Sequence, residues 1–266
     1  MPSITELRDE LRRDRASLEQ NFLQHGQVVR QLVAHSRLID QYLRRVWDAL
    51  ALPENIALVA VGGYGRTELA PKSDIDLLIL LDATADESLQ GKLTELVTQL
   101  WDMGLEVGHS IRTIDECVSE SHDITVQTNL LEARLICGDA KLFDALQVAT
   151  KTHLIPCDFF NAKLKEQQQR HARFVDADFN LEPNIKESPG GLRDLQTVMW
   201  ISRAAGLGTT WQELAKSGLI SVNEAKQIAK HDNLLKNYRS RLHYLAKRRE
   251  DRLLFAFQTP PAAPLG

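Results

Sequence analysis

The sequence predicts an α+β protein in which a small mixed sheet with helices is flanked by helical segments. Apolar side chains recur at helical spacing over residues 5–50, and Pro53 closes that section. The next part alternates short apolar runs with helical patterns, which is typical of strands separated by helices. From about residue 124 to residue 257 the pattern is helical again.

Each predicted element follows from a local pattern, in chain order. The first section carries two helical stripes, formed by Leu7, Leu11, Leu18 and Phe22 and by Val29, Leu32, Val33, Leu43, Val46 and Trp47. Apolar runs predict strands at 56–61, 75–81 and 105–113. A short helix is expected after Gly63, and a longer one from Leu89 to Trp101. The loop EPNIKESPGG interrupts the C-terminal helical pattern.

Changes in these patterns divide the chain into four segments. We expect an N-terminal helical segment at 1–52, a core at 53–148 and a helical domain at 149–258. The last residues, 259–266, read TPPAAPLG, and this Pro/Ala composition is typical of a disordered tail. No internal repeat is present in the sequence.

Composition excludes several classes of function. The net charge of −4 argues against broad nucleic-acid binding, which leaves a basic footprint. No apolar stretch approaches the roughly 20 residues that span a bilayer, and the charged start MPSITELRDELRRDR has no signal region. Cys117, Cys137 and Cys157 are too scattered for a CxxC site, and an odd count suits a reducing compartment. We expect a cytoplasmic protein with no nucleic-acid or membrane partner.

Two carboxylates open the most apolar of the predicted strands. Asp74 and Asp76 are two residues apart, so both side chains point to the same side of a strand. Two like charges in a partly desolvated place repel, and one of them tends to take up a proton. A bound Mg²⁺ removes this repulsion, and it prefers oxygen ligands that it shares with substrate phosphates. A solvated strand edge is the alternative interpretation.

A glycine pair precedes the acid pair. Gly62 and Gly63 have no Cβ, so backbone N–H groups can approach a phosphate closely there. Other phosphate motifs are absent from the sequence, because there is no GxxxxGK(S/T) and Gly63-Tyr64-Gly65 lacks the third glycine of a dinucleotide fingerprint. The combination of strand, Gly-Gly, short helix and Asp-x-Asp predicts a metal–nucleotide site, although each feature alone is more often a turn or a solvated edge.

This combination resembles the polymerase-β-type nucleotidyltransferase superfamily. The resemblance implies a polymerase-β-like core and a third carboxylate on a later strand, which GLEVGHSIRT supplies as Glu106. It also implies that the three carboxylates bind two Mg²⁺ ions, which lie about 3.5–4 Å apart in two-metal sites. One ion would activate the attacking hydroxyl, and the other would stabilise the departing pyrophosphate. Arg66 and Lys72 are weaker candidates for phosphate contact, because surface charges near a turn need no such role.

Four stretches narrow the resemblance to the bacterial protein-PII uridylyltransferases. They are, in order, GGYGRTELAPKSDIDLLIL, WDMGLEVGHSIRT, NIKESPGGLRDLQTVMW and LHYLAKRREDRLLF. The resemblance implies transfer of UMP from UTP to a tyrosine of the PII nitrogen-signalling protein. In that family an HD phosphohydrolase domain and glutamine-sensing ACT domains follow this portion. We therefore expect a truncated chain with no uridylyl-removing activity and no glutamine response.

The segment NIKESPGGLRD is a second candidate phosphate site. Gly190 and Gly191 lead into a predicted helix, whose free N–H groups and dipole would attract an anion. Lys186 and Arg193 add positive charge. By itself the segment favours a capped helix with solvated charges. A similar K-x-x-x-GG-(L/I)-R-(D/E) pattern occurs in glutamine-synthetase adenylyltransferases, and this resemblance implies a role in binding the triphosphate or shaping the cleft.

Two questions stay open in the sequence. A regulatory nucleotide-binding module, or an inactive nucleotidyltransferase-like fragment, is the alternative function. The presence of all three carboxylates favours an enzyme over that alternative. No base-reading residue can be picked out, so the sequence does not separate UTP from ATP as the substrate.

Overall fold

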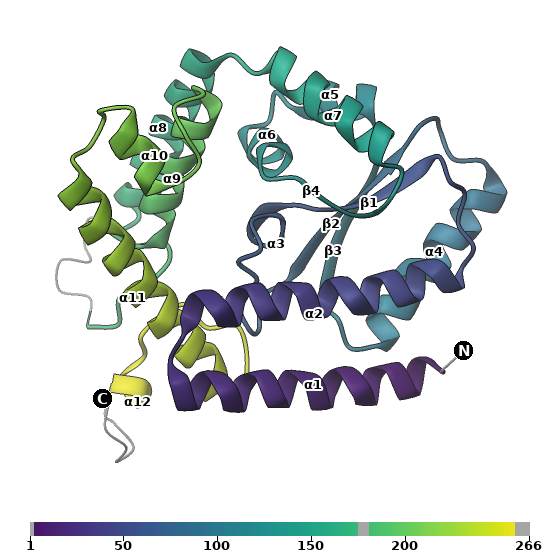
Figure 1. The fold of residues 1–266 in the computed structure, drawn as a ribbon, viewed down its shortest axis with the longest axis horizontal. Coiled ribbons are helices and arrows are strands. Elements are labelled where there is room, and N and C mark those ends of the chain that lie inside the picture. Colours follow the sequence, from purple (N-terminus) through teal and green to yellow (C-terminus); the bar gives the residue numbers. More distant parts are fainter. Residues whose placement is uncertain (1–2, 175–180, 259–266) are drawn as a thin grey trace. The chain divides into compact units, whose positions relative to one another are not determined.

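The computed structural model describes residues 3–174 and 181–258 (Figure 1). The chain folds into two compact units, Met1–Leu154 and Ile155–Gly266. The first contains all the strands found in the described residues, and the second is helical apart from one isolated β-bridge. None of the described helices is long and apolar enough to cross a lipid bilayer.

The first unit is built around a four-stranded mixed sheet in the order β3-β2-β1-β4. The strands are β1 (Ile56–Ala60), β2 (Ile75–Leu81), β3 (Val107–Thr113) and β4 (Arg134–Gly138). Strand β1 runs antiparallel to β2 and β4, whereas β2 and β3 are parallel. The sequence interpretation was wrong at β4, which it treated as helical. The segment RLICG is too short for its period to separate a strand from a helix.

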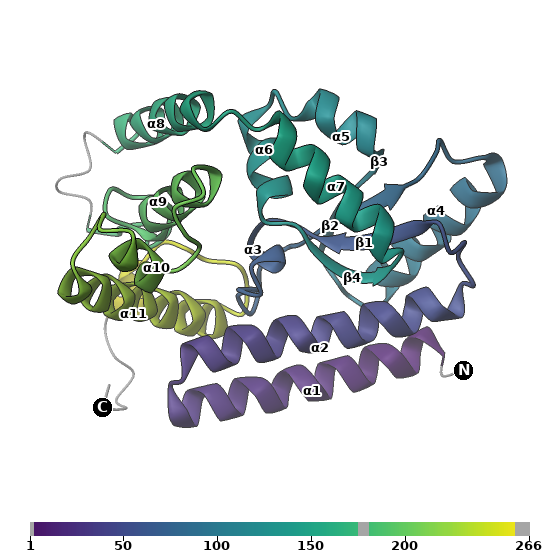
Figure 2. The ribbon, with the colours of Figure 1, turned by 45° about the horizontal axis from the view of Figure 1, so that its top comes forward.

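Helices cover both faces of this sheet (Figure 2). On one face lie α1 (Ile4–His25), α2 (Val28–Ala49) and α4 (Glu87–Asp102). On the other lie α5 (Ile114–Glu120), α6 (Ile124–Leu131) and α7 (Ala140–His153). The one-turn helix α3 (Gly62–Gly65) joins β1 to the loop before β2. The α+β class and the small mixed sheet predicted from the sequence are confirmed.

Side chains of β2 alternate between two hydrophobic clusters. Ile75, Leu77 and Ile79 pack toward α1, α2 and α4, whereas Leu78 and Leu80 pack toward α5, α6 and α7. Such alternation is expected of a strand buried on both faces. It fixes which side of the sheet the acid pair occupies, because Asp74 and Asp76 have the same parity as Leu78.

The second unit consists of helices around a small apolar cluster. Its helices are α8 (Pro156–Ala172), α9 (Leu192–Ala204), α10 (Trp211–Lys216), α11 (Val222–Ala246) and α12 (Phe255–Gln258). Trp211, Leu214 and Ala225 are buried together between α10 and α11. An isolated bridge between Asn184 and Arg252 ties the loop before α9 to the segment after α11. The predicted helical character of this region is confirmed.

The segment boundaries expected from the sequence differ from this division. Helices α1 and α2, expected as a segment at 1–52, share the hydrophobic cluster of the sheet. The expected boundary between residues 148 and 149 falls inside α7, which packs on the same sheet. The expected tail, 259–266, lies outside the described residues.

Candidate active site

The acid pair lies where β2 begins. Asp76 is the second residue of the strand, and Asp74 comes directly before the strand. The intervening Ile75 is buried toward α1, α2 and α4, so both carboxylates belong to the face covered by α5, α6 and α7. Asp76 is exposed and Asp74 is half-buried. The two carboxylates therefore share one side of the sheet at a place that solvent reaches.

Glu106 occupies the neighbouring position across the sheet. The Ile75 N–H donates to the Glu106 carbonyl at 2.8 Å, as expected for the parallel pairing of Ile75 with Val107. Val107 packs against the same cluster as Ile75, so Glu106 has the parity of Asp76. Among the described residues no group of three His, Cys, Asp or Glu side chains is arranged to hold a metal ion. The role of Glu106 as a third ligand stays a prediction.

Two glycines flank the carboxylate of Asp76. A Cβ placed on Gly62 would lie 3.3 Å from Asp76 Oδ2, and one placed on Gly108 would lie 3.1 Å from Oδ1. Gly62 also adopts a positive φ of 58°, which disfavours other residues there. The backbone thus leaves room for both carboxylate oxygens because neither neighbour has a side chain.

The residues at this place fit a magnesium ion. Mg²⁺ is commonly bound by one or two carboxylates together with substrate phosphates. Asp74 and Asp76 supply oxygen donors on one face, and the glycine neighbours keep the space around Asp76 open. These two residues would hold the cation, with Glu106 as the candidate third ligand.

The loop between α3 and the acid pair is anchored to α2. His35 Nδ1 lies 3.1 Å from the Leu69 carbonyl oxygen, and the Leu69 N–H donates to Ser36 Oγ at 3.2 Å. The Ser36 hydroxyl in turn donates to the carbonyl of Leu32. Burial, together with the charge of Arg15, lowers the pKa of His35 to about 4. The ring is therefore neutral at physiological pH and donates its Nδ1–H to Leu69.

Tyr64, in the glycine turn formed by Gly62–Gly65 (α3), is also held in place by residues of α2 and β4. Its hydroxyl donates to the Asp40 carboxylate, which accepts two further hydrogen bonds from Arg134. The Arg134 guanidinium carbon lies 5.3 Å from the centre of the Tyr64 ring. Burial and the nearby Asp40 raise the pKa of Tyr64. The phenol thus anchors α3 and stays protonated.

Arg66, a candidate for phosphate contact, is already paired in this structure. Its guanidinium contacts the carboxylate of Glu132, which directly follows α6, and that of Glu68. Burial disfavours the charged guanidinium, but the two carboxylates outweigh that effect and raise the pKa of Arg66. Lys72 is exposed in the loop before the acid pair. Phosphate contact by Arg66 and Lys72 stays a prediction.

Two neighbours of the acid pair were not predicted from the sequence. Gly108 follows Glu106 by two residues and lies on β3, so the strand alternation could have placed it beside Asp76. Asn129 lies on α6, and its Oδ1 would be 3.4 Å from a Cβ on Gly62. No local pattern points to Asn129, because its position depends on how α6 packs against α3.

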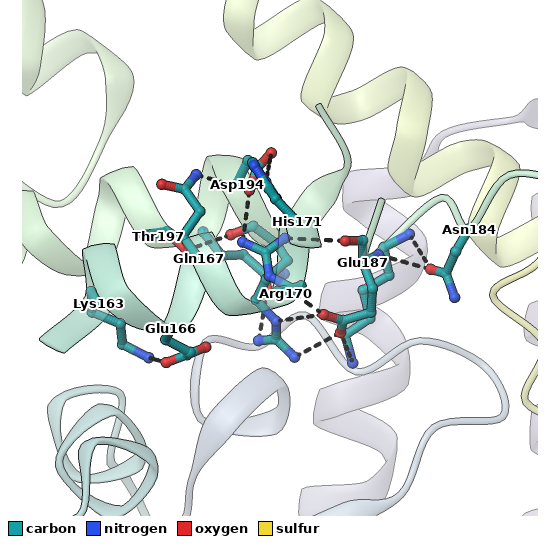
Figure 3. A network of polar contacts seen from close by, with 12 residues as sticks. Lys163, Glu166, Gln167, Arg170, His171, Asn184, Glu187, Asp194 and Thr197 are labelled. Atoms are coloured by element: carbon teal, nitrogen blue, oxygen red, sulfur yellow. Dashed lines mark hydrogen bonds and ion pairs between the residues drawn. The ribbon is translucent and has the colours of Figure 1, made fainter. Parts of the chain in front are cut away.

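In the second unit, a polar network surrounds the start of α9 (Figure 3). The Asp194 carboxylate accepts hydrogen bonds from Gln167, Arg170 and the Gly190 N–H, and it lies 2.9 Å from His171 Nε2. Burial alone would raise the pKa of Asp194, but these hydrogen bonds hold it at about 2. Asp194 therefore ties α9 to the loop that precedes it and joins α8 to α9.

The expectation that the N–H groups at the start of α9 are free to bind an anion was wrong. The N–H groups of Gly191, Leu192 and Arg193 donate to the carbonyls of residues 188, 185 and 186. The loop folds back and occupies these donors, because Asn184 holds it in a turn.

The charges of the same segment are also internally paired. Arg193 pairs with Glu187 at 3.1 Å, and Lys186 lies 3.7 Å from the same carboxylate. Burial, with the charges of Arg193 and Arg239, lowers the pKa of Lys186 to about 8. A role for Lys186, Gly190, Gly191 and Arg193 at the triphosphate stays a prediction that rests on the resemblance.

Comparison with known proteins gives two family matches. The family described as nucleotidyltransferase domain matches residues 43–175, which is half of the chain. The chain belongs to the nucleotidyltransferase domain family. The family described as GlnD PII-uridylyltransferase matches residues 158–266. The nucleotidyltransferase match includes the glycine turn, the acid pair and α6.

Curated relatives of this nucleotidyltransferase chain are similar over almost its whole length. Proteins from Nitrosospira multiformis, Ralstonia nicotianae and Burkholderia lata are 53%, 48% and 47% identical over 98%, 96% and 100% of this chain. Each is named a bifunctional uridylyltransferase/uridylyl-removing enzyme. The chain spans only 30–31% of their length. The resemblance to uridylyltransferases found in the sequence is confirmed.

Proposed function

We propose that this chain transfers UMP from UTP to a tyrosine of a PII-type signalling protein. The observation that carries the proposal is the Asp76 carboxylate, which lies between Gly62 and Gly108 and shares one face of the sheet with Asp74. The names of the relatives support uridylyl transfer. The family match described as PII-uridylyltransferase supports the choice of protein partner.

The reaction forms a bond between the tyrosine oxygen and the α-phosphorus of UTP and releases pyrophosphate. Mg²⁺ held by Asp74 and Asp76 would neutralise phosphate charge and lower the pKa of the attacking hydroxyl. Gly62 and Gly108 contribute no side chain of their own to the space beside Asp76. Glu106, exposed directly before the neighbouring strand, is the candidate that activates the tyrosine hydroxyl. The proposal assigns transfer to this chain and does not assign removal of UMP.

The location of the reaction is part of the proposal. Cys117, Cys137 and Cys157 are free thiols, which fits a reducing compartment. We therefore place the reaction in the cytoplasm. A test is the thiol state of Cys157, the exposed member, in protein taken from cells under rapid acid quench, and extensive disulfide formation would contradict this location.

The test is a transfer assay with UTP labelled at the α-phosphate or at the γ-phosphate, Mg²⁺ and a PII protein. Label should appear on PII only from α-labelled UTP, and a PII variant with phenylalanine in place of the tyrosine should stay unlabelled. Parallel reactions with ATP establish the preferred base. Binding of UTP and Mg²⁺ without transfer would instead support the regulatory nucleotide-binding module.

A further inference from the structure

The side chain of Asn129 reaches the same space as the carboxylate of Asp76. A Cβ placed on Gly62 would lie 3.4 Å from Asn129 Oδ1 and 3.3 Å from Asp76 Oδ2. One point beside this glycine is therefore within contact distance of both side chains. Gly62 has no side chain to fill the space between them.

Helix α6 is held in register with α3, so the position of Asn129 is fixed. A Cβ on Gly65 would overlap the carbonyl oxygen of Glu132, which means that the two backbones are in direct contact. The ion pair between Arg66 and Glu132 closes the same junction. Asn129 lies less than one helical turn before Glu132. Its amide is thus presented to the acid pair by a rigid support.

The Asn129 amide has no hydrogen-bond partner among the residues that the structure describes, and it is half-buried. No side-chain atom of Asn129 is among the buried atoms that lack a partner, so the amide stays open to water or to a ligand. The neighbouring carboxylates can only accept hydrogen bonds when ionised, whereas an amide also donates. A flip about the side chain exchanges its oxygen and nitrogen, so the N–H can face the space above Gly62.

We propose that Asn129 binds the triphosphate of the nucleotide by donating its side-chain N–H to a phosphate oxygen. This inference rests on the proposed function. Phosphate oxygens are the substrate atoms that share a Mg²⁺ site with carboxylates. A hydrogen-bond donor beside Asp76 therefore lies next to the phosphate oxygens of a bound nucleotide. Asn129 therefore adds neutral hydrogen bonding at a place where further negative charge would repel the substrate.

The test compares Asn129→Leu with Gln127→Leu. Both changes replace an amide by an apolar side chain on α6, but residues 127 and 129 project about 200° apart around the helix. Asn129→Leu should raise the KM for UTP by about 10- to 100-fold, the usual value of a hydrogen bond to a charged group. Gln127→Leu should leave it unchanged. The KM for the protein partner should not move in either variant.

Binding without turnover gives a second readout. A UTP analogue with a non-hydrolysable α,β-bridge should bind Asn129→Ala about 10-fold or more weakly in the presence of Mg²⁺, whereas uridine should bind wild type and variant equally. Equal losses for the analogue and uridine would place the contact on the nucleoside and overturn the inference. Unchanged KM and binding in an active enzyme would also overturn it. A wild-type chain that neither binds nor transfers UTP would instead overturn the proposed function.

Discussion

The guanidinium of Arg66 donates two hydrogen bonds from Nη1 to the carboxylate of Glu132, with N···O distances of 2.5 and 2.6 Å. The Glu132 side chain is only 2% exposed. This pair joins the end of the glycine turn to α6, and it is therefore part of the support of the site rather than of its open surface.

Replacing Glu132 by glutamine should destabilise the first unit by about 3 kcal/mol, because a largely buried guanidinium loses its main counter-charge. Glu68 remains as a weaker partner. The control is Glu10→Gln, which breaks the exposed Arg45–Glu10 pair and should cost at most about 1 kcal/mol. Denaturant unfolding of both variants measures the difference, and equal losses would contradict the role assigned to the buried pair.

Acid should weaken the first unit through His35. The folded state prefers the neutral ring, with a pKa of about 4 against the ordinary 6.5, so only the unfolded state binds a proton between these values. The contribution is complete above pH 6.5 and is lost as the pH falls to about 4. The total loss is on the order of 3 kcal/mol.

The comparison for this pH effect is His35→Asn, which keeps an N–H near the Leu69 carbonyl but does not titrate. Unfolding free energies of wild type and variant, measured from pH 4 to pH 7.5, should show the shallower slope in the variant. If the unfolding free energies of wild type and variant change with pH in parallel, His35 is not the cause of the loss of stability in acid.

The acid pair should be needed for transfer and not for folding. We expect Asp74→Asn and Asp76→Asn each to lower UMP transfer by more than about 100-fold, because Mg²⁺ loses an oxygen ligand. Stability should be kept or raised, since a like-charge repulsion is removed. Asp82→Asn, exposed just beyond the opposite end of β2, is the matched control and should transfer normally. Near wild-type transfer by either member of the pair would refute the assignment.

The same assay tests Glu106. Glu106→Gln keeps the size of the side chain but removes its charge, so a third ligand or an activator of the hydroxyl should show a severe loss of transfer. A mild loss would place Glu106 outside the ligand set.

Adding one methyl group beside Asp76 should lower transfer activity without lowering the stability of the fold. In Gly108→Ala the new Cβ would lie 3.1 Å from Asp76 Oδ1, so the carboxylate must shift by a few tenths of an ångström. We expect Mg²⁺-dependent transfer to fall at least about 10-fold while the midpoint of unfolding hardly changes. Gly91→Ala, in the interior of α4 with nothing near its Cβ position, should raise stability by about 1 kcal/mol and leave transfer unchanged. Loss of transfer in both variants would show that any added methyl group disturbs the enzyme, and would contradict a specific effect on Asp76.

Local patterns predicted the elements that carry the acid pair. The apolar run after Asp74 indicated the bounds of β2, and the strand alternation set the common side of Asp74 and Asp76. Strand β4 was missed because a five-residue edge strand between two helices has almost no period of its own.

Contacts between segments far apart in the chain could not be predicted from the sequence. The charge of Arg66 suggested a phosphate, but its nearest partner, Glu132, is 66 residues away. The N–H groups at the start of α9 looked free because the fold-back of residues 185–188 onto them is not visible in a helix-start pattern. Both cases have one cause: the sequence shows which groups can form hydrogen bonds and not which partners satisfy them.

Both backbone groups of Leu69 are bonded to side chains of consecutive residues of α2, His35 and Ser36. A loop secured in this way depends on a helix that precedes the sheet by several residues. A shortened protein that begins at Pro53 would therefore leave the Leu69 amide and carbonyl without these partners and the Tyr64 hydroxyl without Asp40. It would also uncover the part of the apolar sheet face that α1 and α2 cover. A shorter piece that keeps these contacts of the loop and of Tyr64 must include α2, which begins at Val28.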